Sequence, residues 1–91
     1  MEKQAEGAKK GPLAGVRVLE LGTLIAGPFC ARLLGEFGAE VIKIEAPKGG
    51  DQIRGWRKMV GDTSLWWYVQ ARNKKSVTVD LRVPEGQEIV R

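Results

Sequence analysis

The side chains of this chain that could do chemistry are cations and carboxylates, because its 91 residues include no histidine and a single cysteine, Cys30. Without histidine, the chain builds neither a Ser-His-Asp triad nor a zinc site with imidazole ligands. One thiol likewise excludes an internal disulfide and a metal site made of several thiolates. The chemistry that remains is the binding of anions by basic side chains and by glycine-rich backbone.

Positive charge is gathered in two clusters within a formal net charge of +4. Residues 43–58 hold five basic and two acidic side chains, an excess of +3, and a second cluster of +3 consists of Arg72, Lys74 and Lys75. Concentrated positive charge attracts polyanions such as nucleic acid, an anionic membrane or a multiply phosphorylated small ligand. A solvated face that is balanced by neighbouring segments is an equally good interpretation of each cluster.

Three short segments of strand character must position these charges. Residues 16–21 and 40–45 are mostly apolar and residues 76–81 alternate, so each is predicted to be a strand, the first buried on much of both faces. Between the first two, Pro28 suits the first turn of a helix and Gly38 suits its end. Apolar residues also recur there at helical spacing, namely Phe29, Leu33, Leu34 and Phe37. The order strand, helix, strand predicts a βαβ unit with parallel strands, and therefore an α/β fold.

The connection between the first strand and the helix is a candidate binding loop. Ligands of open α/β sheets bind beyond the carboxyl ends of the strands, so residues 22–27 and the segment after Glu45 should border a site. Gly22 and Gly27 would let backbone approach a ligand, and the helix start would offer N–H groups to an anion. The loop is not a G-x-G-x-x-G fingerprint, and a purely structural tight turn is an equally good interpretation.

The remaining segments are less regular. Residues 46–63 are rich in glycine, proline and charge and predict a long exposed loop. Ser64 is placed to cap a short helix that carries the aromatic residues 66–68, which are more typical of packing than of ligand stacking, and that ends near Asn73. Pro84 begins a last helix of which about two turns are present, so we expect the chain to be the N-terminal piece of a longer protein.

The sequence predicts neither a membrane span nor a secretory signal. Its longest uncharged stretch, residues 21–31, is well below the roughly 20 apolar residues that a spanning helix needs. Residues 1–10 are polar and lack the apolar run of a secretory signal. We therefore expect no membrane partner and a reducing, cytoplasmic setting.

Several linked motifs resemble the N-terminus of class III CoA-transferases, the family typified by formyl-CoA transferase and crotonobetaine/carnitine CoA-transferase. They are PLAGVRVLEL at 12–21, AGPF at 26–29, LGEFGAEVIKIE at 34–45, GD at 50–51, RGW at 54–56, RNKKSV at 72–77, DLR at 80–82 and PEG at 84–86. The resemblance covers residues 12–91 and leaves residues 1–11 as a polar N-terminal tail. It implies that 12–91 form the N-terminal part, truncated here, of a Rossmann-like large domain with a parallel sheet.

The resemblance implies an enzyme that moves coenzyme A from an acyl-CoA donor to a carboxylic acid through an aspartyl covalent intermediate. Coenzyme A is then a substrate, no metal or redox cofactor is needed, and the full-length protein is an interlocked homodimer. The family's aspartate lies beyond the matching region, so these 91 residues alone are expected to be inactive and poorly folded. Asp51, Asp62 and Asp80 are expected to be solvated carboxylates at turns and strand ends.

Site residues follow from their positions in the matching motifs. Ile25 and Ala26 are expected to meet coenzyme A near the reaction centre. The end of the third strand is expected to border the nucleotide portion of coenzyme A, where the charge of Arg82 suits it to contact a phosphate. A further motif near the same site is expected to contribute two more site residues. The residues concerned are Val79, Asp80, Leu81 and Arg82 at the strand end, and Asn73 and Lys74 in the further motif. Formyl-CoA transferases carry polar residues where this chain has Thr23-Leu24-Ile25, which favours a more apolar acyl group.

Other interpretations stay open. The α-methylacyl-CoA racemases belong to the same superfamily, but the long segment 46–72 with its Arg54-Gly55-Trp56 motif favours a transferase. The two basic clusters around residues 66–68 could instead form a surface for single-stranded nucleic acid. A non-catalytic, nucleotide-binding fragment is a third interpretation. We expect acyl-CoA and carboxylic acid substrates as partners and no nucleic acid.

Overall fold

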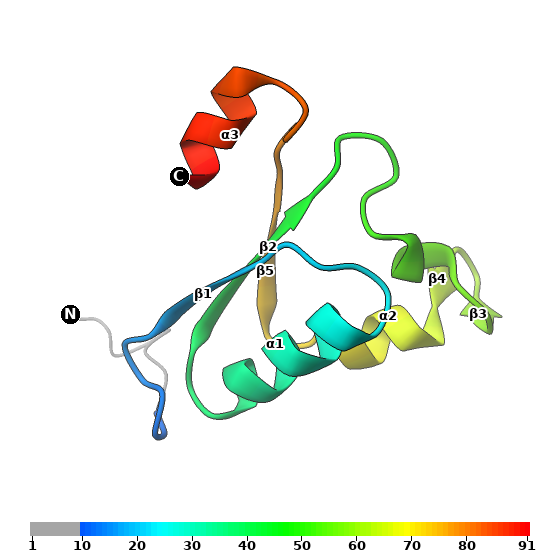
Figure 1. Ribbon diagram of the computed structural model, residues 1–91. Coiled ribbons are helices and arrows are strands. Elements are labelled where there is room, and N and C mark those ends of the chain that lie inside the picture. Colours follow the sequence, from blue (N-terminus) through cyan, green and yellow to red (C-terminus); the bar gives the residue numbers. More distant parts are fainter. Residues whose placement is uncertain (1–9) are drawn as a thin grey trace.

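The structure is a computed structural model that describes residues 10–91, so most of the predicted tail, 1–11, lies outside the described residues. In chain order the elements are β1 (Arg17–Glu20), α1 (Ala26–Glu36), β2 (Glu40–Glu45), the 3-10 helix η1 (Gln52–Gly55), β3 (Met59–Val60), β4 (Thr63–Ser64), α2 (Leu65–Gln70), β5 (Lys74–Thr78) and α3 (Pro84–Val90). Figure 1 shows α1 and α2 side by side, and α3 at the opposite end of the sheet.

The main sheet has three parallel strands in the order β1-β2-β5. Leu19 pairs with Ile42, and Ile42 pairs with Lys75. The predicted parallel α/β arrangement is therefore confirmed. β5 begins two residues before the predicted start and ends at Thr78, and the next amide, of Val79, still donates to the Glu45 carbonyl at 2.9 Å.

The strands are less buried than predicted. On β1, Leu19 is 42% exposed and Glu20 is the buried residue. On β2, alternate residues are buried, namely Val41, Lys43 and Glu45. The prediction that the first strand is covered on much of both faces is wrong for the described chain, because within residues 10–91 α1 packs against β1 and no second helix packs comparably against it.

The helix α1 packs through its small residues. Its buried positions are Pro28, Ala31 and Gly35, while the larger Phe29 and Phe37 stay exposed. A Cβ added to Gly35 would lie 3.3 Å from Val41 Cγ2, so the missing side chain lets the helix approach β2 closely. The spacing of the apolar residues predicted the helix. These residues do not, however, form the face of α1 that packs against the sheet.

The segment between β2 and α2 is mostly exposed, as its composition predicts, but it contains regular structure and two buried anchors. Ile53 is fully buried and Asp51 is 2% exposed. Asp51 caps η1 by accepting a hydrogen bond from the Ile53 amide, and β3 and β4 form a short antiparallel hairpin. The segment folds back onto the molecule because one carboxylate and one apolar side chain are buried within it.

Both predicted helix starts near the C-terminus are confirmed. The Ser64 hydroxyl accepts from the Trp66 amide at 3.0 Å and so caps α2, which ends at Gln70, before the predicted Asn73. Pro84 occupies the first turn of α3. Among residues 10–91, none of the helices is both long and apolar enough to cross a membrane.

Candidate functional site

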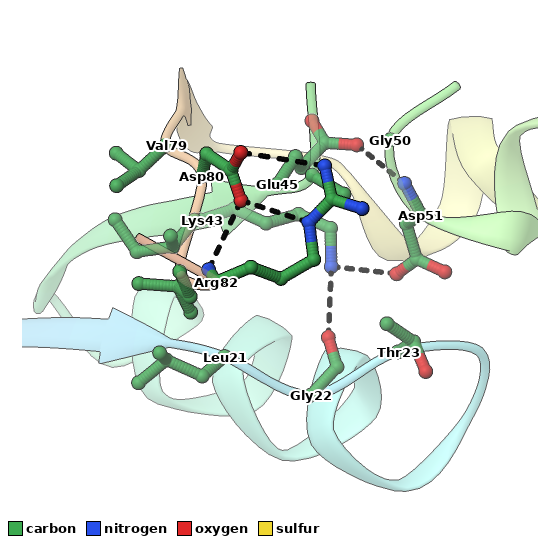
Figure 2. Close-up of a pocket in the computed structure, with 13 residues that line it drawn as sticks. Leu21, Gly22, Thr23, Lys43, Glu45, Gly50, Asp51, Val79, Asp80 and Arg82 are labelled. Carbon is green, nitrogen blue, oxygen red and sulfur yellow. Dashed lines mark hydrogen bonds and ion pairs between the residues drawn. The ribbon is translucent and has the colours of Figure 1, made fainter. Parts of the chain in front are cut away.

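A cavity of about 220 Å³ opens where the carboxyl ends of the three parallel strands meet (Figure 2). Its walls are residues 21–23 after β1, 43–46 at the end of β2, 50–51 in the following loop and 79–82 after β5. This is the place where open α/β sheets bind ligands. The structure thus brings together the first loop and the segment after Glu45, as the sequence predicts.

Of the predicted site residues, Val79, Asp80, Leu81 and Arg82 all line this cavity. The other four do not. Ile25 and Ala26 lie farther along the first loop, at the start of α1.

Asn73 and Lys74 lie at the amino end of β5, where they connect this strand to α1. The Asn73 amide donates to the Gly35 carbonyl at 3.2 Å, and Lys74 Nζ donates to the Pro28 carbonyl at 2.9 Å.

The glycines of the first loop serve the loop itself. A Cβ on Gly22 would lie 3.1 Å from the Cα of Gly27, and one on Gly27 would lie 3.0 Å from the Cα of Gly22. The two ends of the loop therefore touch each other. This close contact supports the interpretation of the loop as a structural tight turn.

Lys43 forms the floor of the cavity. Strand geometry places residues 41, 43 and 45 on one face of β2, so the Lys43 side chain reaches the strand end, where it is 2% exposed. Its ammonium contacts the Glu20 carboxylate. It also contacts Asp51 Oδ2 at 2.7 Å and the Gly22 carbonyl at 3.3 Å (Figure 2). A buried ammonium persists because carboxylates flank it.

A fourth buried group completes this cluster, since Lys74 Nζ lies 2.5 Å from Glu20 Oε1. We call Glu20, Lys43, Asp51 and Lys74 the buried quartet. Each side chain is at most 3% exposed, and two negative and two positive charges sum to zero. Burial lowers the pKa of Lys74, although the Glu20 carboxylate acts in the opposite direction.

The two basic clusters are therefore largely compensated within the chain. Five of their eight basic residues pair with carboxylates, namely Lys43, Arg54, Arg72, Lys74 and Lys75. This pairing removes much of the positive field on which the nucleic-acid interpretation depends.

Asp51 is not the solvated carboxylate that the sequence predicts. Its Oδ1 accepts hydrogen bonds from the amides of Ile53 and Leu24, both at 3.0 Å, and its Oδ2 faces Lys43. Burial alone would raise the pKa of Asp51, but the Ile53 amide, Lys43 and the Leu24 amide outweigh it and the net shift is downward. Asp51 is thus held as a carboxylate.

Glu45 anchors the loop that follows β2. Its carboxylate receives Arg54 Nε at 2.8 Å, Arg54 Nη2 at 2.7 Å, the Asp51 amide at 2.8 Å and the Ser76 hydroxyl. The Arg54 guanidinium, together with the Ser76 and Asp51 donors, lowers the pKa of Glu45 to about 2 despite its burial. The same guanidinium lies 3.8 Å from the centre of the Trp67 ring.

An exposed ion pair stands at the rim of the cavity. Arg82 Nε and Nη2 lie 3.1 and 3.3 Å from the two oxygens of Asp80, and the Arg82 side chain is 82% exposed. The Arg82 guanidinium lowers the pKa of Asp80. The site thus combines a charge-neutral floor with a solvent-facing cation, an arrangement suited to binding a ligand that is anionic at one end.

Sequence reasoning assigned no role to Glu20 or Glu45 and counted Lys43 only as surface charge. A signal was present, because each of these charged residues has an apolar residue on either side of it in the sequence. A lysine flanked by carboxylates on neighbouring buried strands indicates an internal ion pair.

Comparison with known proteins places the chain among CoA-transferases. The family model described as CoA-transferase family III matches residues 13–91. Succinyl-CoA–D-citramalate CoA-transferase from Chloroflexus aurantiacus is 60% identical over 81 residues, which are 88% of this chain and 20% of that protein. Human succinyl-CoA:glutarate CoA-transferase is 44% identical over 81 residues, 88% of this chain and 18% of that protein. The chain therefore spans about a fifth of the length of these curated relatives.

Solved structures agree with this placement. A CAIB/BAIF family protein from Brucella suis matches with a TM-score of 0.78 and 37% identity, over 90% of this chain and 23% of that one. A hypothetical protein from Mycobacterium tuberculosis matches with a TM-score of 0.77 and 38% identity, over 90% and 22% of the two chains. Since the family model also matches nearly the whole sequence, the chain belongs to CoA-transferase family III.

Proposed function

We propose that this chain supplies part of the coenzyme A pocket of an enzyme that transfers coenzyme A from an acyl-CoA to a carboxylic acid. The observation that carries the proposal is the cavity at the carboxyl ends of β1, β2 and β5, with Arg82 at its rim, in a member of CoA-transferase family III. Its volume of about 220 Å³ suits a portion of coenzyme A, since sites for whole drug-sized ligands start at roughly 300 Å³. The exposed guanidinium is suited to a phosphate of that ligand.

As donor we propose succinyl-CoA, and as acceptor a short dicarboxylic acid. The names of both relatives described above contain succinyl-CoA, and those of their acceptors are citramalate and glutarate. These names carry the proposal for donor and acceptor, because the apolar Leu24 and Ile25 of the first loop lie outside the lining of the cavity.

The proposed reaction uses an aspartate as covalent carrier. Its carboxylate attacks the thioester carbonyl, the C–S bond breaks and coenzyme A leaves as thiolate. The thiolate attacks the aspartyl carbonyl of the mixed anhydride, which frees the donor acid and leaves an aspartyl-CoA thioester. The acceptor carboxylate attacks that thioester, and the released thiolate then attacks the acceptor's carbonyl in the second anhydride, so that acceptor-CoA leaves and the aspartate is regenerated.

We do not assign this carrier role to the aspartates of the described chain. Asp51 Oδ1 accepts two amides and its Oδ2 is ion-paired with Lys43. Arg82 donates hydrogen bonds to both oxygens of Asp80. Asp62 lies in the turn between β3 and β4, outside the cavity lining. We propose an aspartate elsewhere in the protein that the native gene encodes.

The test is an exchange assay with that protein, purified from the native gene. Succinyl-CoA is mixed with citramalate, malate or glutarate, and the thioesters are separated by mass. We expect one new thioester, with one succinate released for each. Absence of exchange with every acid, together with no binding of coenzyme A by calorimetry, would refute the proposal. Epimerisation of a 2-methylacyl-CoA without transfer would instead indicate the racemase function.

We further propose that the protein acts as a cytoplasmic homodimer without a metal or redox cofactor. The exposed Phe29, Leu33 and Phe37 on α1 support a face that is covered in the working protein. Light scattering on the purified protein tests the homodimer. Its metal content tests the absence of a metal.

A further inference from the structure

Two buried charged side chains join the loops that wall the cavity. Lys43 Nζ contacts the Gly22 carbonyl at 3.3 Å on one side and Asp51 Oδ2 at 2.7 Å on the other. Asp51 Oδ1 accepts the Leu24 amide at 3.0 Å, across 27 positions of sequence. The first loop is therefore attached through its Gly22 carbonyl to β2 (Figure 2) and through its Leu24 amide to the segment after β2.

The attachment coincides with an unfavourable backbone conformation. Leu24 has φ 64°, in the left-handed region that bulky residues rarely adopt. Such conformations persist where surrounding interactions hold them. The next residue, Ile25, precedes the first residue of α1 and makes no capping hydrogen bond with its side chain. The Asp51 carboxylate is therefore the side chain that fixes the path of the loop into the helix.

We propose that Asp51, with Lys43, is a positioning residue that holds residues 21–23 as one wall of the cavity and thereby sets the geometry of coenzyme A transfer. This inference rests on the proposed function, because the wall matters for catalysis only if the acyl-CoA binds there. It concerns position, since Asp51 Oδ1 accepts the Leu24 and Ile53 amides and Oδ2 is buried against the Lys43 ammonium.

The chemistry of the contact suggests a set of variants for the full protein. Asp51→Ala removes both acceptors. Asp51→Asn keeps an acceptor oxygen for the two amides but turns an NH₂ toward Lys43 and leaves the buried quartet with one surplus positive charge. Lys43→Met removes that ammonium, so the pair Lys43→Met/Asp51→Asn again has no surplus charge, with Glu20 and Lys74 still paired. Asp62→Asn, on an exposed aspartate, is the matched control.

Hydrogen exchange followed by mass spectrometry reports on the loop without reference to activity. In Asp51→Ala we expect amides of 22–27 to exchange at least about tenfold faster, while those of 40–45 stay protected. We expect Asp51→Asn to resemble Asp51→Ala, and the double variant to regain most of the protection because the side-chain oxygen introduced at position 51 accepts the same amides. Asp62→Asn should match the wild type.

Steady-state kinetics with succinyl-CoA then show whether the loop matters for transfer. A misplaced wall should lower kcat by about 10- to 100-fold, with a smaller change in KM, and the double variant should recover activity in step with its protection. Wild-type exchange of residues 22–27 in Asp51→Ala, or faster exchange with unchanged kcat, would overturn the inference. If the wild type itself transfers no coenzyme A, the proposed function fails, and the catalytic part of the inference fails with it, while the exchange data still decide whether Asp51 anchors the loop.

Discussion

Arg82 is the residue at the cavity rim that an anionic ligand would meet first. Its pairing with Asp80 is exposed to solvent, and exposed ion pairs add little stability. Exchanging the Asp80 carboxylate for a phosphate therefore loses little. Under the proposed function, this pair would keep the guanidinium oriented at the cavity until a phosphate of the ligand takes the place of the Asp80 carboxylate.

For Arg82→Ala we expect the KM for acyl-CoA to rise about tenfold with kcat nearly unchanged, because a contact far from the reacting bond stabilises ground state and transition state alike. Stability should not change measurably. Arg91→Ala, which removes an exposed cation paired with Glu88, is the control and should leave KM as it is. An unchanged KM in Arg82→Ala would remove this residue from the binding site.

Glu45 gives the protein a specific sensitivity to acid. Its folded pKa of about 2 lies below the ordinary value of 4.5, so its contribution is complete above pH 4.5 and is lost as the pH falls toward 2. The shift corresponds to on the order of 3 kcal/mol. We expect the free energy of unfolding of Glu45→Gln, measured with urea, to lie well below that of the wild type at pH 6. The difference should shrink as the pH falls to 3. Glu88→Gln should track the wild type, and a constant gap for Glu45→Gln would contradict the assignment.

The position of a single residue could be predicted from the sequence where it depends on the residue's own segment, and not where it depends on contacts with distant segments. Val79–Arg82 could be placed at the cavity because the resemblance puts them at the end of the third strand, although residues 79–81 were predicted to lie within that strand and follow it in the structure. The burial of Asp51 could not, because it depends on Lys43 and on Leu24, which its own neighbourhood in the sequence does not specify.

The position of α3 depends on the missing side chain of Gly86. A Cβ on Gly86 would lie 1.9 Å from the Asp80 carbonyl oxygen and 3.2 Å from Val79 Cγ1. The first turn of α3 therefore rests directly on the backbone that lines the cavity. A change at this contact transmits to the site.

We expect Gly86→Ala to destabilise the protein by about 2 kcal/mol, as overpacking does, and to weaken binding of coenzyme A. Calorimetric titration and thermal unfolding measure the two effects. Gly55→Ala is matched to it, since a Cβ on Gly55 meets nothing within 4 Å, and should show neither effect. If Gly86→Ala binds normally, α3 does not support the site.

Element types were predictable from local patterns, and element surroundings were not. β2 has the predicted bounds, and Ser64 and Pro84 mark their helices as expected. The buried face of α1 was not predictable from its apolar residues, because close packing on the sheet selects small side chains such as Gly35. The fold of residues 46–63 likewise depends on contacts made outside the segment.

At the scale of the whole molecule, much apolar surface remains uncovered. The exposed large hydrophobic residues occur on β1, on α1, on α2 and on α3, where Ile89 is 73% exposed. A chain of this size has a small core. The described chain therefore holds its site with few buried apolar side chains and with the buried quartet.

For the 91 residues expressed alone, we expect a broad, non-cooperative thermal transition by circular dichroism and strong binding of a hydrophobic dye. The protein from the native gene is the comparison and should unfold in a sharp transition. A sharp transition in the 91-residue chain, with a calorimetric enthalpy equal to the van't Hoff value, would show that this segment is stable by itself.

The zero net charge of the buried quartet also constrains how this sequence can drift. Replacing one of its four members leaves an uncompensated ion away from water, whereas replacing an acid and a base together does not. We therefore expect coupled substitutions in the buried quartet, although its members are spread over 55 positions of the chain. Among descendants of this gene, their substitutions should arise in acid–base pairs.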